Sequence, residues 1–343
     1  MPKVIQLKEI RNDFSSNIRK LIDLCKDDIA EISNLIIEKL DSDVPLIKEM
    51  ARYVVLSGGK RLRSLLTVAC AKMAGYGFNK EEKRHICLAV VIEFIHTATL
   101  VHDDVVDESK LRRGKKSANE VWGNKPSVLV GDFIFSKAFE LIANDRSEEV
   151  LKLLSNTSVI IAEGEMLEIA NDKDITISED TYFKVINGKT ASLFSAACQA
   201  GGITANINKN KQEALKTFGT NFGISYQLID DALDYYSSSS KLGKNIGDDF
   251  KEGKITMPII LAYLRSSNDE KKFWNRTIKN LNQDEGDFSK GINIINKYNC
   301  IEDTILRAKH FSNIALDSLG TFDENEYKKN LLDLVRSSLK RTS

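Results

Sequence analysis

Apolar residues along this chain recur at spacings of three and four positions, which is the period of an α-helix. The pattern is clear within a helix expected over residues 12–40, at Ile29, Ile32, Leu35, Ile36 and Leu40. The chain has only four prolines, so long intervals remain in which helices can continue unbroken. Strand-like alternation between hairpin signals is scarce. The sequence therefore predicts an all-α fold.

Interruptions of this pattern predict where the helices begin and end. Residues 41–44 form a turn, and Pro45 suits the first turn of the next helix, which ends at residues 57–59. Further helices are expected to carry residues 86–107, 128–143, 148–170, 209–236 and much of 259–339, with a polar connection at 282–287. A helix break is expected at 187–190 and a polar loop at 237–240. No Pro/Ser-rich linker divides the chain, so residues 1–343 are expected to form one large domain.

Composition narrows the functional class. The 49 basic and 49 acidic residues give a net charge of zero, and no long block of one sign indicates a nucleic-acid-binding tail. The five cysteines are isolated from one another, as in a reduced protein rather than a zinc site or disulfide scaffold. The first residues lack a signal-peptide core, and no apolar run reaches the ~18 residues of a membrane span. These features predict a soluble, cytoplasmic protein that does not bind nucleic acid.

The segment His102-Asp103-Asp104-Val105-Val106-Asp107 follows an apolar run, residues 86–101. On a helix Asp103 and Asp107 share one face, and two such charges ~4 Å apart repel by ~1 kcal/mol in water and ~4 kcal/mol at an effective dielectric of 20. A solvated helix end is the simple interpretation of one such cluster. A second cluster, Asp230-Asp231-Ala232-Leu233-Asp234, again follows an apolar run. The repeat favours a hard cation such as Mg²⁺, shared with substrate phosphates.

Cations and a histidine accompany these clusters. Lys60, Arg61 and Arg63 follow two glycines and could form an anion cradle, although a solvated basic turn gives the same pattern. Lys60 and Arg63 are expected to share a helix face, because they are three residues apart, whereas Arg61 faces differently. His96 lies two turns before Asp103, as either a core residue or a phosphate donor. Five more cations lie within residues 110–116. The segment 187–190 resembles the end of a P-loop but lacks its first glycine, so nucleotide binding is disfavoured.

Six segments in order resemble the trans-polyprenyl diphosphate synthases, a family that includes farnesyl, geranylgeranyl, octaprenyl and solanesyl diphosphate synthases. They are GGKRLR (58–63), EFIHTATLVHDDVVDESKLRRG (93–114), SVLVGDFIFSKAF (127–139), GKT (188–190), YQLIDDALDY (226–235) and GKNIGDDFKEGKITMP (243–258). The resemblance spans about residues 20–340, leaving 1–19 as an N-terminal extension. It is strongest to long-chain bacterial enzymes that make quinone side chains, such as ubiquinone.

The resemblance implies a bundle of mostly antiparallel helices around a deep central cavity, usually as a homodimer. It implies condensation of isopentenyl diphosphate onto an allylic diphosphate, such as farnesyl diphosphate, with three Mg²⁺ ions bound. The implied metal ligands are Asp103, Asp107 and Asp230. The implied isopentenyl diphosphate ligands are Lys60, Arg63, His96 and Arg113. Those implied around the allylic diphosphate and the developing cation are Arg112, Lys189, Thr190, Gln227, Lys244 and Lys254. Glu93 is expected to be a structural partner.

The chain departs from the family pattern at Ser64, Glu168, Tyr226 and Met257, where proline, glutamine, phenylalanine and leucine are usual. Chain length should depend on Ala98 and Thr99, since short-product enzymes carry aromatic residues at these positions. Small residues there should admit a product of about eight to ten isoprene units, although they could simply allow close helix packing. Ile142 or Leu154 is the expected floor. Release of a lipid product implies transient membrane contact.

Other classes fit less well. A terpene cyclase shares the fold and one aspartate cluster, but it uses an Asn/Ser/Glu metal triad in place of the second and needs no second diphosphate site. An accessory subunit of a heteromeric synthase typically loses aspartates, whereas all six are present here. A helical bundle that only binds partners would leave the two acidic faces unexplained. A shorter-chain synthase of the geranylgeranyl type remains the alternative within the family.

Overall fold

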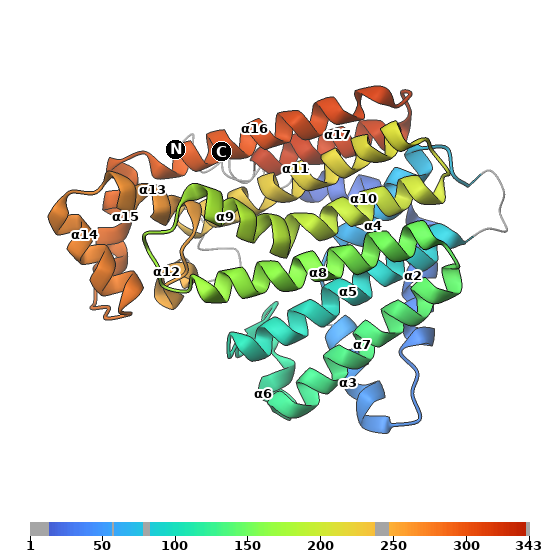
Figure 1. The fold of residues 1–343 in the computed structure, drawn as a ribbon, viewed down its shortest axis with the longest axis horizontal. Helices are drawn as coiled ribbons and strands as arrows, with labels where there is room; N and C mark the ends of the chain where they lie inside the picture. The colour runs from blue at the N-terminus through green and yellow to red at the C-terminus, as the bar shows by residue number, and fades with distance from the viewer. Residues whose placement is uncertain (1–13, 57, 78–82, 237–246, 341–343) are drawn as a thin grey trace.

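The computed structural model describes residues 14–56, 58–77, 83–236 and 247–340, and nearly all of their regular structure is helical (Figure 1). Residues 14–24 are helical. The elements that follow, up to the first aspartate cluster and the segments beside it, are α2 (Lys26–Lys39), α3 (Pro45–Leu56), α4 (Leu62–Met73), α5 (Arg84–Val106), β1 (Leu111–Arg112), β2 (Lys115–Lys116), α6 (Ala118–Trp122), α7 (Asn124–Asp145) and α8 (Glu148–Ala170).

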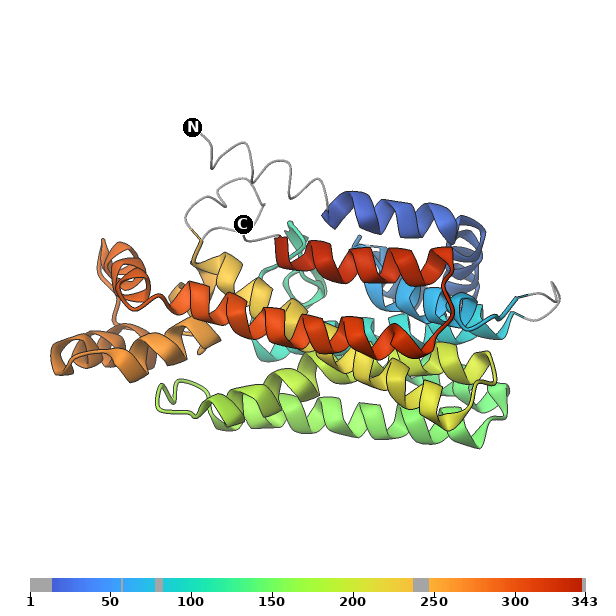
Figure 2. The same cartoon turned by 90° about the horizontal axis from the view of Figure 1, so that it is seen from above.

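The second half of the chain continues as helices. They are α9 (Glu179–Ile186), η1 (Asn187–Ala191), α10 (Ser192–Thr204), α11 (Lys209–Asp234), α12 (Asp248–Glu252), α13 (Met257–Arg265), α14 (Asn268–Trp274), η2 (Asn275–Lys279), α15 (Asp287–Lys297), α16 (Cys300–Ser318), η3 (Leu319–Thr321) and α17 (Glu326–Leu339). Figure 2 shows the segment that holds α14 and α15, in orange, extending from one end of the bundle. The all-α prediction is confirmed.

Helix α5 lies in the middle of the bundle and packs against α2, α4, α7 and α10. Its apolar residues occupy every side of the helix, and such a helix is stable in water only when other helices surround it. It is the one described helix long and apolar enough to cross a membrane, and most of that window is buried inside the protein. Its polar C-terminal end carries the first aspartate cluster, so packing along α5 fixes where that cluster stands.

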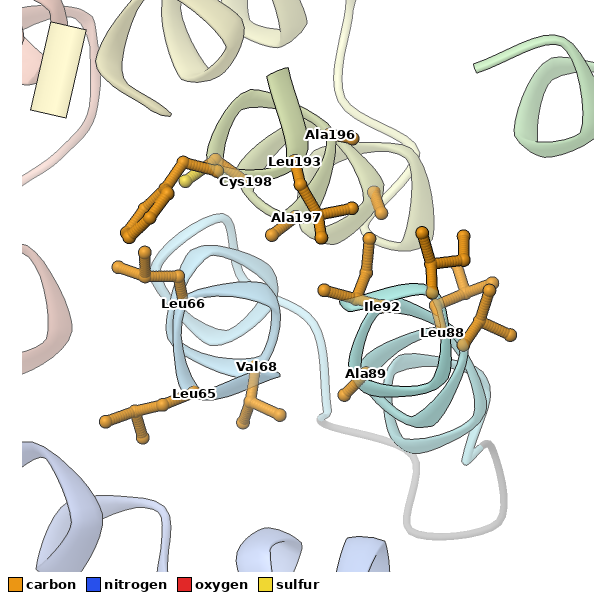
Figure 3. Close-up of a cluster of buried hydrophobic side chains, with 14 of the residues drawn as sticks. Leu65, Leu66, Val68, Leu88, Ala89, Ile92, Leu193, Ala196, Ala197 and Cys198 are labelled. Atoms are coloured by element: carbon orange, nitrogen blue, oxygen red, sulfur yellow. The ribbon is translucent and has the colours of Figure 1, made fainter. Parts of the chain in front are cut away.

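The tightest part of the core lies where α4, α5 and α10 meet. Figure 3 shows Leu66 of α4 and Ile92 of α5 pointing toward Ala197 of α10. Small residues on α10 allow this close approach, since a Cβ on Gly201 would lie 2.5 Å from the Thr67 carbonyl oxygen. Burying each large side chain contributes about 1.5–3 kcal/mol. This cluster therefore holds α5 against α4 and α10, and α5 carries the first aspartate cluster.

Helix α11 joins this core to a second one. Its N-terminal part contributes Phe218 and Phe222 to the first cluster of buried side chains. Its C-terminal part contributes Leu228 and Ile229 to the second cluster, which also contains Trp274 and residues of α13 and α16. The second aspartate cluster thus stands on a helix that both cores hold.

Two of the expected helix boundaries are wrong. The helix expected over 12–40 is interrupted at Cys25, whose backbone leaves helical geometry although its amide still bonds to the Leu21 and Ile22 carbonyl oxygens. The break expected at 187–190 is instead a continuous helix, in which the π-helical turn η1 joins α9 to α10. Asn-Gly marks a break where glycine needs a positive φ, but Gly188 does not have one here. The predicted loop at 237–240 lies outside the described residues.

Gly188 serves close packing. A Cβ on Gly188 would lie 2.8 Å from the Gly164 Cα, and a Cβ on Gly164 would lie 2.7 Å from the Lys189 backbone nitrogen. The two glycines therefore let α8 and η1 touch through their backbones. Wide π-helical turns of this kind are frequent at functional sites, and this one places Lys189 opposite α8 and Thr190 opposite α11.

The basic segment 110–116 forms a β-hairpin, which the sequence did not predict. Leu111 pairs with Lys116 and Arg112 with Lys115. The two turn residues, Arg113 and Gly114, have φ angles of 54° and 77°. Two positive φ values in a two-residue turn are the geometry of a type I′ hairpin. The hairpin directs Arg112 and Arg113 back toward the end of α5.

Replacing Gly164 with alanine should destabilise the protein by about 1–3 kcal/mol, because the added methyl group would overlap the η1 backbone, which cannot move aside as a flexible side chain could. The free energy of unfolding in urea measures this. Gly320→Ala is the matched control, since a Cβ there meets nothing within 4 Å. Equal stability of the two variants would show that the glycine contact does not hold α8 against η1.

Candidate active site

A cavity of about 1400 Å³ opens between α5, α7, α8, α9, η1, α11 and α12. Both aspartate clusters line it: Asp103 and Asp107 from the end of α5, and Asp230 and Asp231 from α11. Beside these carboxylates stand Lys189, Thr190, Gln227 and Lys254, and deeper in the cavity the lining becomes apolar, with Ile95, Ala98, Phe135 and Ile161. The cavity therefore joins a charged mouth to an apolar interior.

The six aspartates divide into two kinds. Three have donors supplied by the fold. Asp104 accepts from the Arg112 guanidinium, with Nε at 2.8 Å. The Asp231 carboxylate accepts from the Tyr182 hydroxyl and from Gln227 Nε2, the latter at 2.9 Å. Asp234 accepts from the Asp249 amide at 3.1 Å. Asp104, Asp231 and Asp234 therefore anchor their helices.

Asp103, Asp107 and Asp230, the three predicted metal ligands, present carboxylates to the cavity. The pKa of Asp103 is raised to about 6. Burial is the largest cause, Lys189 reduces the increase, and Asp107 adds to it. A bound divalent cation would reverse that repulsion and favour the ionised carboxylates. In the part of the chain that the structure describes, no three His, Cys, Asp or Glu side chains gather closely enough to enclose an ion. The carboxylates fit a metal that takes further oxygens from a ligand, as Mg²⁺ does with phosphates.

A hydrogen-bonded chain connects the second cluster to the π-helical turn. The Thr190 hydroxyl donates to Gln227 Oε1 at 3.1 Å, and Gln227 Nε2 donates to Asp231. Burial raises the pKa of Asp231 to about 7, although the hydrogen bonds from Tyr182 and Gln227 lower it in part. The chain fixes the orientation of the Gln227 amide and the Thr190 hydroxyl at the cavity wall.

Two of the described lysines that line the cavity, Lys189 and Lys254, are each paired with glutamates. Lys189 Nζ lies 2.9 Å from Glu165 Oε2 and 2.5 Å from Glu168 Oε2. Burial lowers the pKa of Lys189, but Glu168, Glu165 and Asp103 more than offset this and raise it overall. Lys254 Nζ lies 2.7 Å from Glu252 Oε2. Lys244, also predicted at this site, lies outside the described residues.

A second cationic cluster lies behind the end of α5. Arg63 Nη1 lies 3.1 Å from His96 Nε2. Because a guanidinium can only donate, His96 accepts through Nε2 as a neutral ring. Burial lowers the pKa of His96 well below its usual value, and Arg63 and Arg113 lower it further. Arg63 Cζ also lies 4.4 Å from the centre of the Phe194 ring, and Lys60 Nζ lies 5.1 Å from the centre of the Phe14 ring.

Glu93 is buried among these cations, as expected of a structural partner. Burial raises its pKa, while Arg61, Arg63 and Arg113 lower it in part. Ser64, one of the departures from the family pattern, donates to Glu93 Oε2 at 3.3 Å. One acidic residue thus offsets the repulsion among several cations gathered at one place.

The glycine pair at 58–59 has a steric role. A Cβ on Gly59 would lie 2.5 Å from Arg113 Nη1, so the guanidinium would have to shift, and the φ angles of 100° and 126° at Gly58 and Gly59 favour glycine in any case. The expected shared helix face of Lys60 and Arg63 is wrong, because α4 begins at Leu62 and Arg61 has a left-handed backbone. The chain turns there, and tertiary packing rather than helical spacing brings the two cations to one cluster.

The predicted chain-length residues line the cavity, with Ala98 buried and Thr99 half-buried below the first aspartate. Ile142 and Leu154, the expected floor, are buried in the core and do not line this cavity. Ile142 lies near the C-terminal end of α7 and Leu154 near the N-terminal end of α8, away from the residues of these helices that line the cavity. Phe135 and Ile161 are the large apolar side chains of those helices that line it.

Sequence reasoning missed several residues of the cavity. Glu165 stands one turn before Glu168 on α8, and this three-residue spacing on one helix face was a usable signal. Tyr182, the donor to Asp231, carried no signal because its partner is 49 positions away. Asp248, Asp249 and Glu252 add carboxylates from α12.

Asp231→Asn should destabilise the protein by about 1–2 kcal/mol, because an amide nitrogen would replace one of two carboxylate oxygens that each accept a hydrogen bond. Urea unfolding without divalent cations measures the effect. Asp107→Asn is the control, since Asp107 is exposed and its charge repels Asp103. An equal loss in both variants would contradict the division of the aspartates into two kinds.

Comparison with known proteins gives a consistent result. The family model described as polyprenyl synthetase matches residues 44–295. An octaprenyl diphosphate synthase from Escherichia coli (strain K12) is 39% identical over 325 residues, which are 95% of this chain and 99% of the relative. The crystal structure of a decaprenyl diphosphate synthase from Rhodobacter capsulatus has a TM-score of 0.90 and 40% identity, over 95% of this chain and 99% of that chain.

A third match carries ligands. The crystal structure of a polyprenyl synthase from Caulobacter crescentus, complexed with calcium and isoprenyl diphosphate, has a TM-score of 0.89 and 42% identity, over 95% of this chain and 98% of that chain. The fold, the six aspartates and the extent of these matches lead to one conclusion. The chain belongs to the polyprenyl synthetase family.

Proposed function

We propose that this chain is a prenyltransferase that condenses isopentenyl diphosphate onto an allylic diphosphate, with farnesyl diphosphate as primer, and makes a long-chain all-trans polyprenyl diphosphate. The observation that carries the proposal is the cavity that joins two carboxylate-bearing walls, together with Lys189 and Lys254, to an apolar interior. Relatives named octaprenyl and decaprenyl diphosphate synthase support it. A quinone side chain is the proposed use of the product.

In this proposal, the allylic diphosphate binds at the mouth of the cavity. Mg²⁺, three ions by family resemblance, would be held by Asp103, Asp107 and Asp230 and would neutralise charge on the departing pyrophosphate. Lys189, Lys254 and Lys244 supply further positive charge. Thr190 and Gln227 place oxygen dipoles beside the carbon that becomes positive. Arg112 orients the first cluster through Asp104, and family resemblance also assigns it to the allylic diphosphate.

The second substrate, isopentenyl diphosphate, is assigned to Lys60, Arg63, His96 and Arg113. When the allylic carbon–oxygen bond breaks, pyrophosphate leaves with the bonding electrons. The double bond of isopentenyl diphosphate then attacks the allylic carbon, a carbon–carbon bond forms, and the resulting cation loses a proton to pyrophosphate. Arg63 and His96 are partly exposed, so a diphosphate can reach them.

Product length is proposed to be octaprenyl to decaprenyl, because Ala98 and Thr99 leave the cavity open below the aspartates. A geranylgeranyl-type product is the alternative. Assembly as a homodimer, location in the cytoplasm and transient membrane contact during product release are proposed by family resemblance, with a heteromeric synthase as the alternative assembly. One domain over residues 1–343 is proposed to carry the activity.

Purified protein mixed with farnesyl diphosphate, isopentenyl diphosphate and Mg²⁺ should release pyrophosphate, and a chelator should stop the release. Asp103→Asn should lower the rate at least about 100-fold, because it removes charge that holds the metal-bound leaving group. Asp132→Asn, an exposed carboxylate at the edge of the same cavity, should retain most of the activity. No pyrophosphate release by folded protein with metal present would favour the accessory-subunit alternative.

Ala98→Phe should shorten the product, because a ring at this buried position would fill the cavity below Asp103 and stop the growing chain. Chromatography of radiolabelled product, with mass spectrometry, measures the length. Thr99→Ser, which keeps a small side chain at the neighbouring cavity position, is the control and should leave the length unchanged. A product of unaltered length from active Ala98→Phe would contradict the assignment.

A further inference from the structure

Lys189 stands between three carboxylates at the mouth of the cavity. Its ammonium group contacts Glu165 and Glu168 of α8, and Asp103 of α5 is close enough to affect its pKa. All four side chains line the same cavity. The lysine side chain is 29% exposed, so water screens these charges less than it would at an open surface.

The ion pairs with the glutamates compete with any role of Lys189 in binding a diphosphate. An ammonium group has three N–H donors, and two of them point at glutamate oxygens in this structure. One donor is left for an anion, and an anion that takes a second donor must displace a glutamate. Breaking that ion pair costs free energy, which offsets part of the attraction between the ammonium group and the phosphate oxygen.

The two glutamates are not equivalent. The Glu165 side chain is 23% exposed and that of Glu168 is 42% exposed, so Glu168 stands at the outer lip of the cavity. Glu168 also makes the shorter contact with Lys189, at 2.5 Å. A diphosphate entering from solvent meets the Glu168 pairing first. Glu168 can be replaced with less disturbance of packing because more of its surface is in water.

We propose that Glu168 is a positioning residue that holds Lys189 in the empty site and competes with diphosphate for it, so that it weakens the binding of the allylic substrate and speeds the departure of pyrophosphate. This inference rests on the proposed function, because that function places Lys189 at the diphosphate. It adds a role for a carboxylate that faces the substrate anion, where simple charge complementarity would place none.

The size of the effect follows from the geometry. Exposed ion pairs contribute up to about 1 kcal/mol, and a partly buried pair lies at the upper end of that range. Since 1.4 kcal/mol corresponds to a factor of ten, removing the Glu168 charge should tighten pyrophosphate binding about three- to fivefold. The same change should lower the KM for the allylic diphosphate. It should also lower kcat wherever pyrophosphate release limits turnover.

The direct test is calorimetric binding of inorganic pyrophosphate, in the presence of Mg²⁺, to the wild-type protein and Glu168→Gln. The amide keeps the shape and the acceptor oxygen of the side chain but removes its charge. Glu163→Gln is the matched control, because Glu163 is exposed on the same helix and does not line the cavity. We expect tighter binding in Glu168→Gln and a change of less than about twofold in Glu163→Gln.

A double-mutant cycle separates competition for Lys189 from a general effect of charge. In a Lys189→Ala background, Glu168→Gln should change pyrophosphate binding less than about twofold, since the contested group is gone. If Glu168→Gln tightens binding equally in both backgrounds, long-range repulsion explains the effect and the proposal fails. Unchanged or weaker binding in Glu168→Gln alone also overturns it.

The binding measurement is independent of turnover, so the two proposals can fail separately. Prenyl transfer by the wild-type protein together with unaltered pyrophosphate binding in Glu168→Gln would reject only the role of Glu168. Tighter binding that depends on Lys189, in a protein that transfers no prenyl group, would reject only the proposed function. Urea unfolding of both variants verifies that each remains folded.

Discussion

Repulsion between carboxylates on two walls of one cavity is the constraint on which the rest of the structure depends. Three of the six clustered aspartates accept hydrogen bonds that hold them in the fold, from Arg112 to Asp104, from Tyr182 and Gln227 to Asp231, and from a backbone amide to Asp234. These contacts hold the ends of α5 and α11 in place. The remaining three face the cavity, where burial and repulsion raise the pKa of Asp103 and prepare the site for a cation.

The helical bundle makes this arrangement rigid. Helix α5 is buried on nearly every side and α11 belongs to both cores, so packing fixes the position of each aspartate cluster. Glycines at 164 and 188 bring the backbone of η1 against α8, which places Lys189 opposite two glutamates. The contact between the two glycines therefore also determines where the Lys189 charge lies.

The cationic cluster beside α5, which includes Arg63 and Arg113, gathers positive rather than negative charge. Burial lowers the pKa of Arg63 to about 10 and that of His96 well below its usual value, while Glu93 supplies a buried carboxyl group among them. A site that gathers cations at this cost is prepared for an anionic ligand. In the proposed function this region takes isopentenyl diphosphate, and the carboxylate-lined mouth of the cavity takes the allylic diphosphate.

The sequence alone determined the helical class, most helix boundaries and the two aspartate clusters, because helical periodicity and local spacing depend on near neighbours. It did not determine which aspartates face the cavity, since the donors Tyr182 and Gln227 come from different helices. It also predicted a break at Gly188, where glycine instead serves a close contact with Gly164. The hairpin at 111–116 and the partners of Lys189 likewise depend on packing between distant segments. Contacts far apart in sequence are fixed only when the bundle forms, and they decided which of the predicted residues share one cavity.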